Sequence, residues 1–386
     1  MSSSSSSRNQ PKENPLSRPS VAKTRPPLGD VVNRRNPLGD ITNQKTGSRI
    51  SAPSSTLVHC SNKIGKSKKA SKPPKAIAKS NLLVPYEDIE LNQGSDLGND
   101  DDDEVVDDID SNLVDPQLCG AFACDIYEHL RSSEVKKRPA FDYMERVQPN
   151  ISASMRTILI DWLVEVAEEY RLLPETLYLA VNCLDRYLSG NVITKQNLQL
   201  LGVSCMLIAS KYEEVCVPQV ESFCYITDNT YSRNELLEME SSVLNYLKFE
   251  LTTPTAKCFL RRFVRAAQGK KEVSSLLFES IASYFSELSL LDYAMLRYAP
   301  SLVAASAVFL AQCILHPSRK PWSSTLEHYT SYRAKHLEAC VKNLLQLCHE
   351  SPSADVVAVR KKYSQDKYKF AAKKFCPTSL PQELFL

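Results

Sequence analysis

Almost no residues of this chain have the types and spacing that catalysis requires. Gly65-Lys66-Ser67 resembles the end of a phosphate-binding loop, but Cys60 stands where that loop needs its first glycine, and no strand precedes it. The six histidines lack metal-ligand spacing, and the twelve cysteines contain no C-x-x-C pair. No Asp or Glu stands out as half of an acid–base pair. The sequence therefore predicts no catalytic residue, no metal site and no cofactor.

The run of residues 155–167 favours a different chemistry, the recognition of another protein. On a helix, one face of the run would point to a core, with Ile160, Leu163, Val164 and Ala167. Met155, Ile158 and Trp162 widen the apolar sector toward Glu165 and Glu169, to roughly 240°, where a surface helix needs roughly 100°. This surplus packs against a neighbouring helix, or it forms an exposed patch for a ligand with basic and branched aliphatic side chains.

The elements that must position these residues form an all-α fold that is repeated. From residue 116 onward, apolar residues recur at helical spacing, and no long alternating run predicts a strand. Segments match at an offset of about 101 residues. The matched pairs are 203–209 with 305–311, 162–163 with 263–264, and Leu236, Val243 and Leu244 with Leu337, Leu344 and Leu345. We expect helical halves at 116–251 and 252–365, followed by a basic tail that forms a terminal helix and extends the second domain to 375.

A cluster of charges differs between the two halves. Lys211 follows a nearly apolar run and is followed by Glu213 and Glu214, whose carboxylates oppose the dipole at the end of a helix. Lys211 and Glu240 either form an internal ion pair or bind the backbone of a partner. Their counterparts in the second half are Cys313 and Val341. The first half is therefore the predicted binding half.

The first 115 residues differ from the rest in composition. Residues 1–80 hold 16 Lys or Arg and 3 Asp or Glu, whereas residues 81–115 hold 13 Asp or Glu and no Lys or Arg. Such a polar composition buries too little apolar surface to offset chain entropy, so we expect a disordered arm that ends in an acidic spacer. No signal-like segment and no run of 18 apolar residues occurs, which favours an intracellular protein without a membrane partner.

Several motifs resemble the cyclin box of A-type cyclins, of the plant kind. They are M-R-T-I-L-I-D-W-L from Met155, the segment from Leu172 to Ser189, A-S-K-Y-E-E from Ala209, and Y-I-T-D-N-T-Y from Tyr225. The resemblance covers about 116–375 and implies two five-helix folds that bind and activate a cyclin-dependent protein kinase. This chain departs from the common pattern at Thr157, Tyr212 and His129, where Ala, Phe and Tyr are usual.

The resemblance also implies roles for individual residues. The kinase would be bound by Lys211, Tyr212, Glu213, Glu214, Glu240, Phe249 and Leu251. Substrates and inhibitors with an R-x-L motif would dock on Met155, Ile158, Leu159, Trp162, Glu165 and Gln199. The kinase would be activated allosterically, because its catalytic Lys–Glu pair depends on a mobile helix that a partner can hold.

The arm carries motifs that resemble destruction signals read by the anaphase-promoting ubiquitin ligase. Two R-x-x-L-x-x-x-x-N copies comprise Arg25, Leu28 and Asn33, then Arg35, Leu38 and Asn43. Lys12, Glu13 and Asn14 form a KEN sequence, and lysines between 45 and 79 are candidate ubiquitin acceptors. The basic cluster Lys66, Lys68, Lys69, Lys72 and Lys75 is either a nuclear import signal, a solvated linker or a weak nucleic-acid contact.

A transcription factor with paired cyclin-like folds is the alternative from another class. That alternative predicts a zinc ribbon near the amino end and a basic face on the second fold. The arm contains a single cysteine, Cys60, so it offers no zinc ligand set. We therefore expect a timed cell-cycle regulator in the nucleus and also the cytoplasm, without direct nucleic-acid binding.

Overall fold

The two matched, nearly charge-free segments lie at the centres of two helical folds. The structure is a computed structural model that describes residues 106–111, 119–269, 275–350 and 356–386. Helix α7 (Lys195–Glu213) is buried from Leu198 to Ser210. Helix α12 (Pro300–Leu315) is buried from Val303 to Ala311. A helix that is apolar all round must be covered on every side, which explains why each fold is built about one such helix.

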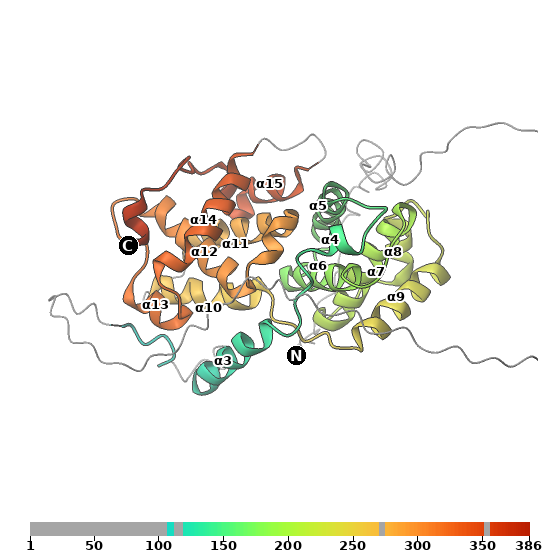
Figure 1. The fold of residues 1–386 in the computed structure, drawn as a ribbon, viewed down its shortest axis with the longest axis horizontal. Coiled ribbons are helices and arrows are strands. Elements are labelled where there is room, and N and C mark those ends of the chain that lie inside the picture. The colour runs from blue at the N-terminus through green and yellow to red at the C-terminus, as the bar shows by residue number, and fades with distance from the viewer. Residues whose placement is uncertain (1–105, 112–118, 270–274, 351–355) are drawn as a thin grey trace, which may run out of the picture. The chain divides into compact units, whose positions relative to one another are not determined.

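Four helices contact α7 in the first fold (Figure 1). They are α5 (Ala153–Glu169), α6 (Pro174–Leu188), α8 (Val220–Tyr225) and α9 (Arg233–Leu247). In the second fold, the corresponding helices are α10 (Ala256–Gln268), α11 (Leu276–Leu291), α13 (Ser324–Thr330) and α14 (Ala334–His349). Helices α10, α11 and α14 contact α12, and α13 packs on α10. The described residues contain helices and no strand, so the predicted tandem all-α fold is confirmed.

Helices outside the repeats attach to these two folds. They are α3 (Ala123–Glu134), α4 (Tyr143–Arg146) and α15 (Ala358–Tyr363). Short 3-10 turns comprise η2 (Gly120–Phe122), η3 (Tyr293–Arg297), η4 (Asp366–Tyr368), η5 (Ala371–Lys373) and η6 (Gln382–Phe385). Glu134 of α3 accepts a hydrogen bond from the backbone N–H of Ser301, at 2.9 Å, so α3 caps the start of α12.

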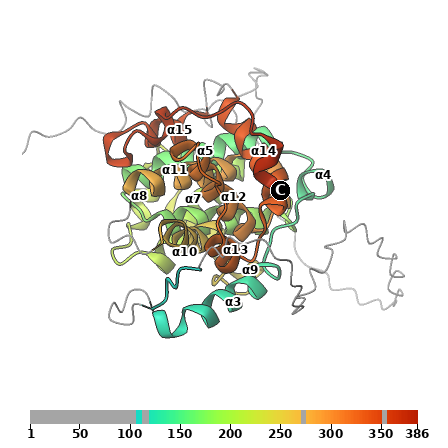
Figure 2. The same ribbon diagram turned by 90° about the vertical axis from the view of Figure 1, so that its left-hand side faces the viewer.

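The helix in the basic tail is shorter than the sequence predicts. Helix α15 ends at Tyr363, and the left-handed residues Lys369 and Phe370, with φ of 54° and 55°, exclude a continuous helix beyond it. Figure 2 shows α15 beside α5 and α11, both of which it contacts. The tail therefore packs on both folds as expected, but as a short helix followed by separate turns.

Local signals set where several helices begin. Helix α9 starts with a capping box, in which the Ser232 hydroxyl accepts from the backbone N–H of Glu235 and the Glu235 carboxylate accepts from that of Ser232. Helices α6 and α12 each begin with a proline, which lacks the N–H that a first turn leaves unpaired. These signals fix the helix ends that border the surfaces described below.

Two buried ion pairs lie where the two folds meet, one on the first fold and one on the second. Arg156 donates to both carboxylate oxygens of Asp185, each at 2.7 Å, and to the carbonyl oxygen of Leu290 in α11 at 3.0 Å. Lys362 pairs with Glu287 at 2.6 Å. Because these charges are shielded from water, each depends on its partner for stability.

Two acidic residues of α5 hold the returning chain. Asp161 accepts hydrogen bonds from the backbone N–H groups of Val357 and Ala358, both at 2.9 Å. Two turns later, Glu168 accepts from Lys367 Nζ and from the Tyr368 hydroxyl, at 2.5 and 2.9 Å. These contacts attach the segment after α14 to the first fold.

The described end of the acidic segment is bound, and is not the solvated spacer that its charge predicts. Arg262 donates to both carboxylate oxygens of Asp110, at 2.8 and 2.6 Å. The Arg262 guanidinium lies over the Tyr127 ring, 4.5 Å from its centroid. The predicted destruction motifs, the basic cluster and the candidate ubiquitin acceptors lie outside the described residues.

Candidate functional site

The charged end of α7 contains the ion pair that the sequence left as one of two alternatives. Lys211 Nζ lies 2.6 Å from Glu240 Oε1, so these side chains bind each other in the free chain. The Glu240 side chain is only 10 % exposed, whereas that of Lys211 is 46 % exposed. An ammonium group has three donors, and this pair occupies one of them. Lys211 therefore keeps donors that can reach a second protein.

The chain after α9 is joined to the end of α7. The Tyr212 hydroxyl lies 2.7 Å from Thr252 Oγ1, and Lys137 Nζ donates to the Thr252 carbonyl oxygen at 3.2 Å. Tyr212 is exposed, while Leu251 is half-buried against the core. The structure thus joins the predicted residue Tyr212 to the position next to Leu251, forty residues further along the chain.

Two consecutive residues at the end of α9 have left-handed backbone conformations. Lys248 has φ of 55° and Phe249 has φ of 58°. The Phe249 N–H donates to the Leu244 carbonyl oxygen at 3.0 Å, which fixes this turn. For residues with a Cβ, such a conformation costs roughly 1–2 kcal/mol each. The turn holds the Phe249 side chain 66 % exposed to water.

The two glutamates at the end of α7 have different surroundings. Glu214 accepts hydrogen bonds from the Leu173 backbone N–H, at 2.7 Å, and from the Thr176 hydroxyl. It therefore caps the start of α6, where a negative charge is stabilised by the helix dipole. Burial, together with the nearby carboxylates of Glu175 and Glu214, raises the pKa of Glu213. Glu213 is half-buried beside these two carboxylates.

The sequence analysis missed exposed apolar residues beside this cluster. Val215 is 98 % exposed, and Val217 and Leu173 are also exposed. The signal that could have found them is the apolar V-C-V-P run, which directly follows a charged helix end. We define the α7-end surface as Lys211, Tyr212, Glu213, Val215, Glu240 and Phe249. It combines exposed apolar side chains with one partly used cation, as protein-binding surfaces do.

The predicted docking residues on α5 and α7 are largely buried in this structure. Met155, Leu159 and Gln199 are buried, and Trp162 is only 4 % exposed. Ile158 is half-buried, whereas Glu165 is exposed. A Cβ on Gly202 would lie 2.8 Å from Leu159 Cδ1, so this glycine permits α7 to approach α5 closely. Most of the surplus apolar surface of α5 is thus packed, which favours the first of the two alternatives that the sequence left open.

Gln199 differs from the other docking residues because it is both buried and polar. Its Nε2 atom has no hydrogen-bond partner among the described residues. A buried donor without an acceptor is unfavourable by roughly 1–3 kcal/mol. An incoming peptide carbonyl that reached this group would remove that penalty.

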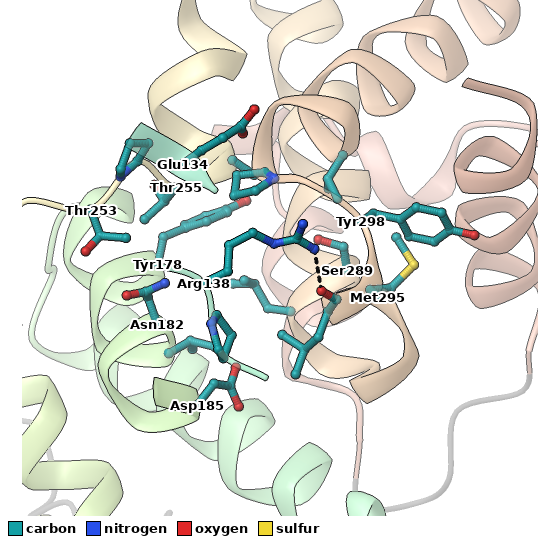
Figure 3. Close-up of a pocket in the computed structure, with 18 of the residues that line it drawn as sticks. Glu134, Arg138, Tyr178, Asn182, Asp185, Thr253, Thr255, Ser289, Met295 and Tyr298 are labelled. Carbon is teal, nitrogen blue, oxygen red and sulfur yellow. Dashed lines mark hydrogen bonds between the residues drawn. The ribbon is translucent and has the colours of Figure 1, made fainter. Parts of the chain in front are cut away.

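A cavity of about 100 Å³ lies between the two folds (Figure 3). Tyr178, Asn182 and Asp185 of α6 line one side of it, and Ser289 and Met295 line the other. Its charged groups have internal partners, since Asp185 binds Arg156 and the Arg138 guanidinium donates to the Leu296 carbonyl oxygen at 2.7 Å. The arrangement suits packing between folds and offers no nucleophile beside a base.

Across 106–111, 119–269, 275–350 and 356–386, no group of three or more His, Cys, Asp or Glu could hold a metal ion. No helix of these ranges is long and apolar enough to cross a membrane.

Comparisons with known proteins agree with the paired folds. Residues 125–252 match the cyclin N-terminal domain, and residues 254–377 match the cyclin C-terminal domain. Cyclin-A1-2 of Arabidopsis thaliana is 69 % identical, over 99 % of this chain and 100 % of the relative. Cyclin-A1-1 of Oryza sativa subsp. japonica is 64 % identical, over 72 % of this chain and 55 % of the relative.

A solved structure shows the same fold. The X-ray structure of a viral cyclin from herpesvirus saimiri superimposes with a TM-score of 0.52 at 25 % identity, over 57 % of this chain and 96 % of that one. Three findings agree on the family: the full-length match to a cyclin, the two cyclin domain matches and the duplicated five-helix architecture. The chain therefore belongs to the A-type cyclins, which are non-catalytic regulatory subunits of protein kinases.

Proposed function

We propose that this cyclin binds and activates a cyclin-dependent serine/threonine kinase through the α7-end surface, and so controls progress through S phase and mitosis. The observation that carries the proposal is Phe249. Two unfavourable backbone conformations hold its ring in water, and Tyr212 and Val215 are exposed as well. Both the strained backbone and the exposed ring are unfavourable in the free chain, and a partner that buries the ring offsets this free energy.

The proposed mechanism is a shift between two states of the kinase. Kinase catalysis needs a Lys–Glu ion pair whose Glu lies on a mobile helix. Changing that helix from about 1 % to about 99 % active requires roughly 5.5 kcal/mol of differential binding. Full burial of one large apolar side chain contributes about 1.5–3 kcal/mol. Burial of Phe249, Tyr212 and Val215 on the active state alone would therefore contribute an amount of the same order as this requirement. Lys211, held by Glu240, would donate to a backbone carbonyl of the kinase.

The test compares two exposed phenylalanines. Phe249→Ala should lower kinase activation and binding at least tenfold, because it removes apolar contact at the interface. Phe375→Ala is the matched control, since that ring is 85 % exposed but lies in the tail. Neither change should move the midpoint of thermal unfolding by more than about 2 °C. Equal activation by both variants would refute the assignment of this surface.

The ion pair gives a second test of the same surface. Replacing both Lys211 and Glu240 by Ala should abolish activation while leaving the helical circular dichroism signal intact. Because Lys211 is nearly half exposed, loss of the pair should cost less than about 1 kcal/mol of folding free energy. Unfolding of the double variant would instead assign the pair a purely internal role.

Recruitment of R-x-L substrates is the second part of the proposal, and it uses the α5–α7 seam. The unpaired Gln199 amide supports it, as does the exposed carboxylate of Glu165, which suits the arginine of the motif. Glu165→Arg should weaken binding of an R-x-L peptide about tenfold. Glu238→Arg on α9 is the control, because it changes charge equally at another exposed position. Equal weakening by both would show only a general charge effect.

Timed destruction is the third part of the proposal. It is supported by the tandem R-x-x-L-x-x-x-x-N copies and the KEN sequence described above, which are the kind of extended peptide that a receptor captures. Changing Arg25, Leu28, Arg35 and Leu38 to Ala should lengthen the half-life of the protein in mitotic extract. An unchanged half-life would remove this part of the proposal while leaving kinase activation untouched.

Residence in the nucleus, with some of the protein in the cytoplasm, completes the proposed function. The cluster from Lys66 to Lys75 supports it, because runs of basic residues are read by import receptors. Neutralising these lysines should shift a fluorescent fusion toward the cytoplasm. An unchanged distribution would show that the cluster is a solvated linker.

A further inference from the structure

Two thiols meet where the tail crosses the end of α14. Cys348 is the last residue but one of α14, and Cys376 lies in the tail between η5 and η6. Each thiol shifts the pKa of the other, and the Tyr284 hydroxyl of α11 also acts on the pKa of Cys348, so the three groups lie close together. Both cysteines are half-buried, so a small reagent can reach them.

Surrounding contacts hold this thiol pair in place. Arg360 donates to the carbonyl oxygens of Leu347, Cys348 and Glu350, at 2.9, 2.9 and 2.8 Å. Nε2 of His349 lies 2.9 Å from the Pro377 carbonyl oxygen, directly after Cys376. These contacts hold the end of α14, which carries Cys348, against the tail segment that carries Cys376.

We propose that Cys348 and Cys376 are a redox modification site, at which a peroxide-class oxidant forms a reversible disulfide that fastens the tail to α14. This inference is independent of the kinase proposal. None of the groups that it uses belongs to the α7-end surface or to the α5–α7 seam.

The reactivity of the two thiols is consistent with this role. The hydrogen bond from Cys376 lowers the pKa of Cys348 to about 6, and the charges of His349 and Arg360 act in the same direction. The pKa of Cys376 is raised, chiefly by the same hydrogen bond. Cys348 is therefore the thiolate that attacks first, and Cys376 is the resolving thiol.

The reaction balances with hydrogen peroxide as the oxidant. The Cys348 thiolate attacks one peroxide oxygen, an S–O bond forms, the O–O bond breaks, and the hydroxide released takes a proton to become water. The Cys376 sulfur then attacks the Cys348 sulfur, the S–O bond breaks, and a second water leaves with the Cys376 proton. Two thiols lose two electrons and peroxide gains them. A dithiol reductant reverses the change.

The experiment uses the full chain, reduced, exposed to equimolar hydrogen peroxide at pH 7 and then alkylated. Trypsin releases Cys348 in residues 343–360 and Cys376 in residues 375–386, each as the single cysteine of its peptide. We expect a linked pair of these peptides to appear at least ten times faster than oxidation of the exposed Cys216. In Cys376→Ser the linked pair should vanish, and Cys348 should be trapped as its sulfenic acid by dimedone.

Thermal unfolding separates a functional link from an accidental one. The disulfide closes a loop between positions 348 and 376, so the oxidised protein should melt at least about 5 °C higher, and dithiothreitol should reverse the shift. Cys376→Ser should show no such shift. Oxidation of Cys216 as fast as linkage, or a linked protein that melts no higher, would overturn the proposal.

Discussion

The Arg156–Asp185 pair permits a sharp test of what holds α5 and α6 together in the core of the first fold. Both side chains are 1 % exposed and joined by two hydrogen bonds of 2.7 Å. Asp185→Asn preserves the volume but places an NH2 group against the Arg156 guanidinium, which then carries an unbalanced buried charge. Loss of one partner of such a pair costs about 3–5 kcal/mol. The midpoint of urea denaturation should therefore fall by about 1 M or more.

A double-mutant cycle isolates the interaction from side effects. Arg156→Met alone should also cost about 3–5 kcal/mol, because it leaves the Asp185 carboxylate with the Tyr143 hydroxyl as its remaining side-chain partner. The double variant should cost at least 2 kcal/mol less than the sum of the two single variants. Additive costs would refute the reasoning, since they would mean that the pair does not stabilise the fold through its charges.

An exposed pair of the same chemistry is the control for this cycle. Arg233 lies 3.1 Å from Glu221, but the two side chains are 58 % and 65 % exposed. Solvent screens such a pair, so Arg233→Met should cost less than about 1 kcal/mol. A similar cost at both sites would show that burial does not set the difference.

Three further predictions concern single residues. Burial raises the pKa of Asp161 to about 6, so the contribution of this group to stability is complete below about pH 4 and is lost as the pH rises through 6. Relative to Asp161→Asn, the wild-type protein should lose about 2–3 kcal/mol of unfolding free energy between these pH values. A difference between the two proteins that does not change with pH would contradict this prediction. Ser232→Ala removes the cap of α9 and should cost about 1 kcal/mol in urea denaturation. Ser280→Ala is the control and should cost less than half of that, because the Ser280 hydroxyl lies inside α11 and donates only to the Leu276 carbonyl oxygen of the same helix. Glu214→Ala should cost about 1–2 kcal/mol and lower kinase activation less than Phe249→Ala does, because Glu214 caps α6; the reverse order in an activity assay would place Glu214 at the interface.

The parts of the fold that follow from local pattern were predictable from the sequence. Residues 203–209 and 305–311 have no charged side chain, and both are buried in the central helices. Leu236 and Leu337, matched by the repeat, are each fully buried. Such features depend on spacing along one helix, which a sequence displays directly.

Features that depend on partners distant in sequence were not predictable. Arg156, Asp161 and Asp185 look like ordinary polar positions on helices, yet all three are buried against groups from other elements. Periodicity also left open whether Trp162 is exposed, and the structure buries it because Gly202 lets α7 pack closely on α5. The left-handed turn that exposes Phe249 has no glycine or asparagine to signal it.

The carboxylates of Asp161 and Glu168 have a consequence for anyone who dissects this gene. The duplicated halves invite a cut near residue 252, yet α5 of the first half receives its hydrogen-bond donors from residues 357–368 of the second. In a first half produced by itself, Asp161 and Glu168 would lose these hydrogen-bond donors. Arg156 would lose the Leu290 carbonyl oxygen of α11 that accepts its hydrogen bond. We therefore expect the two folds to be stable only when they are produced as one chain.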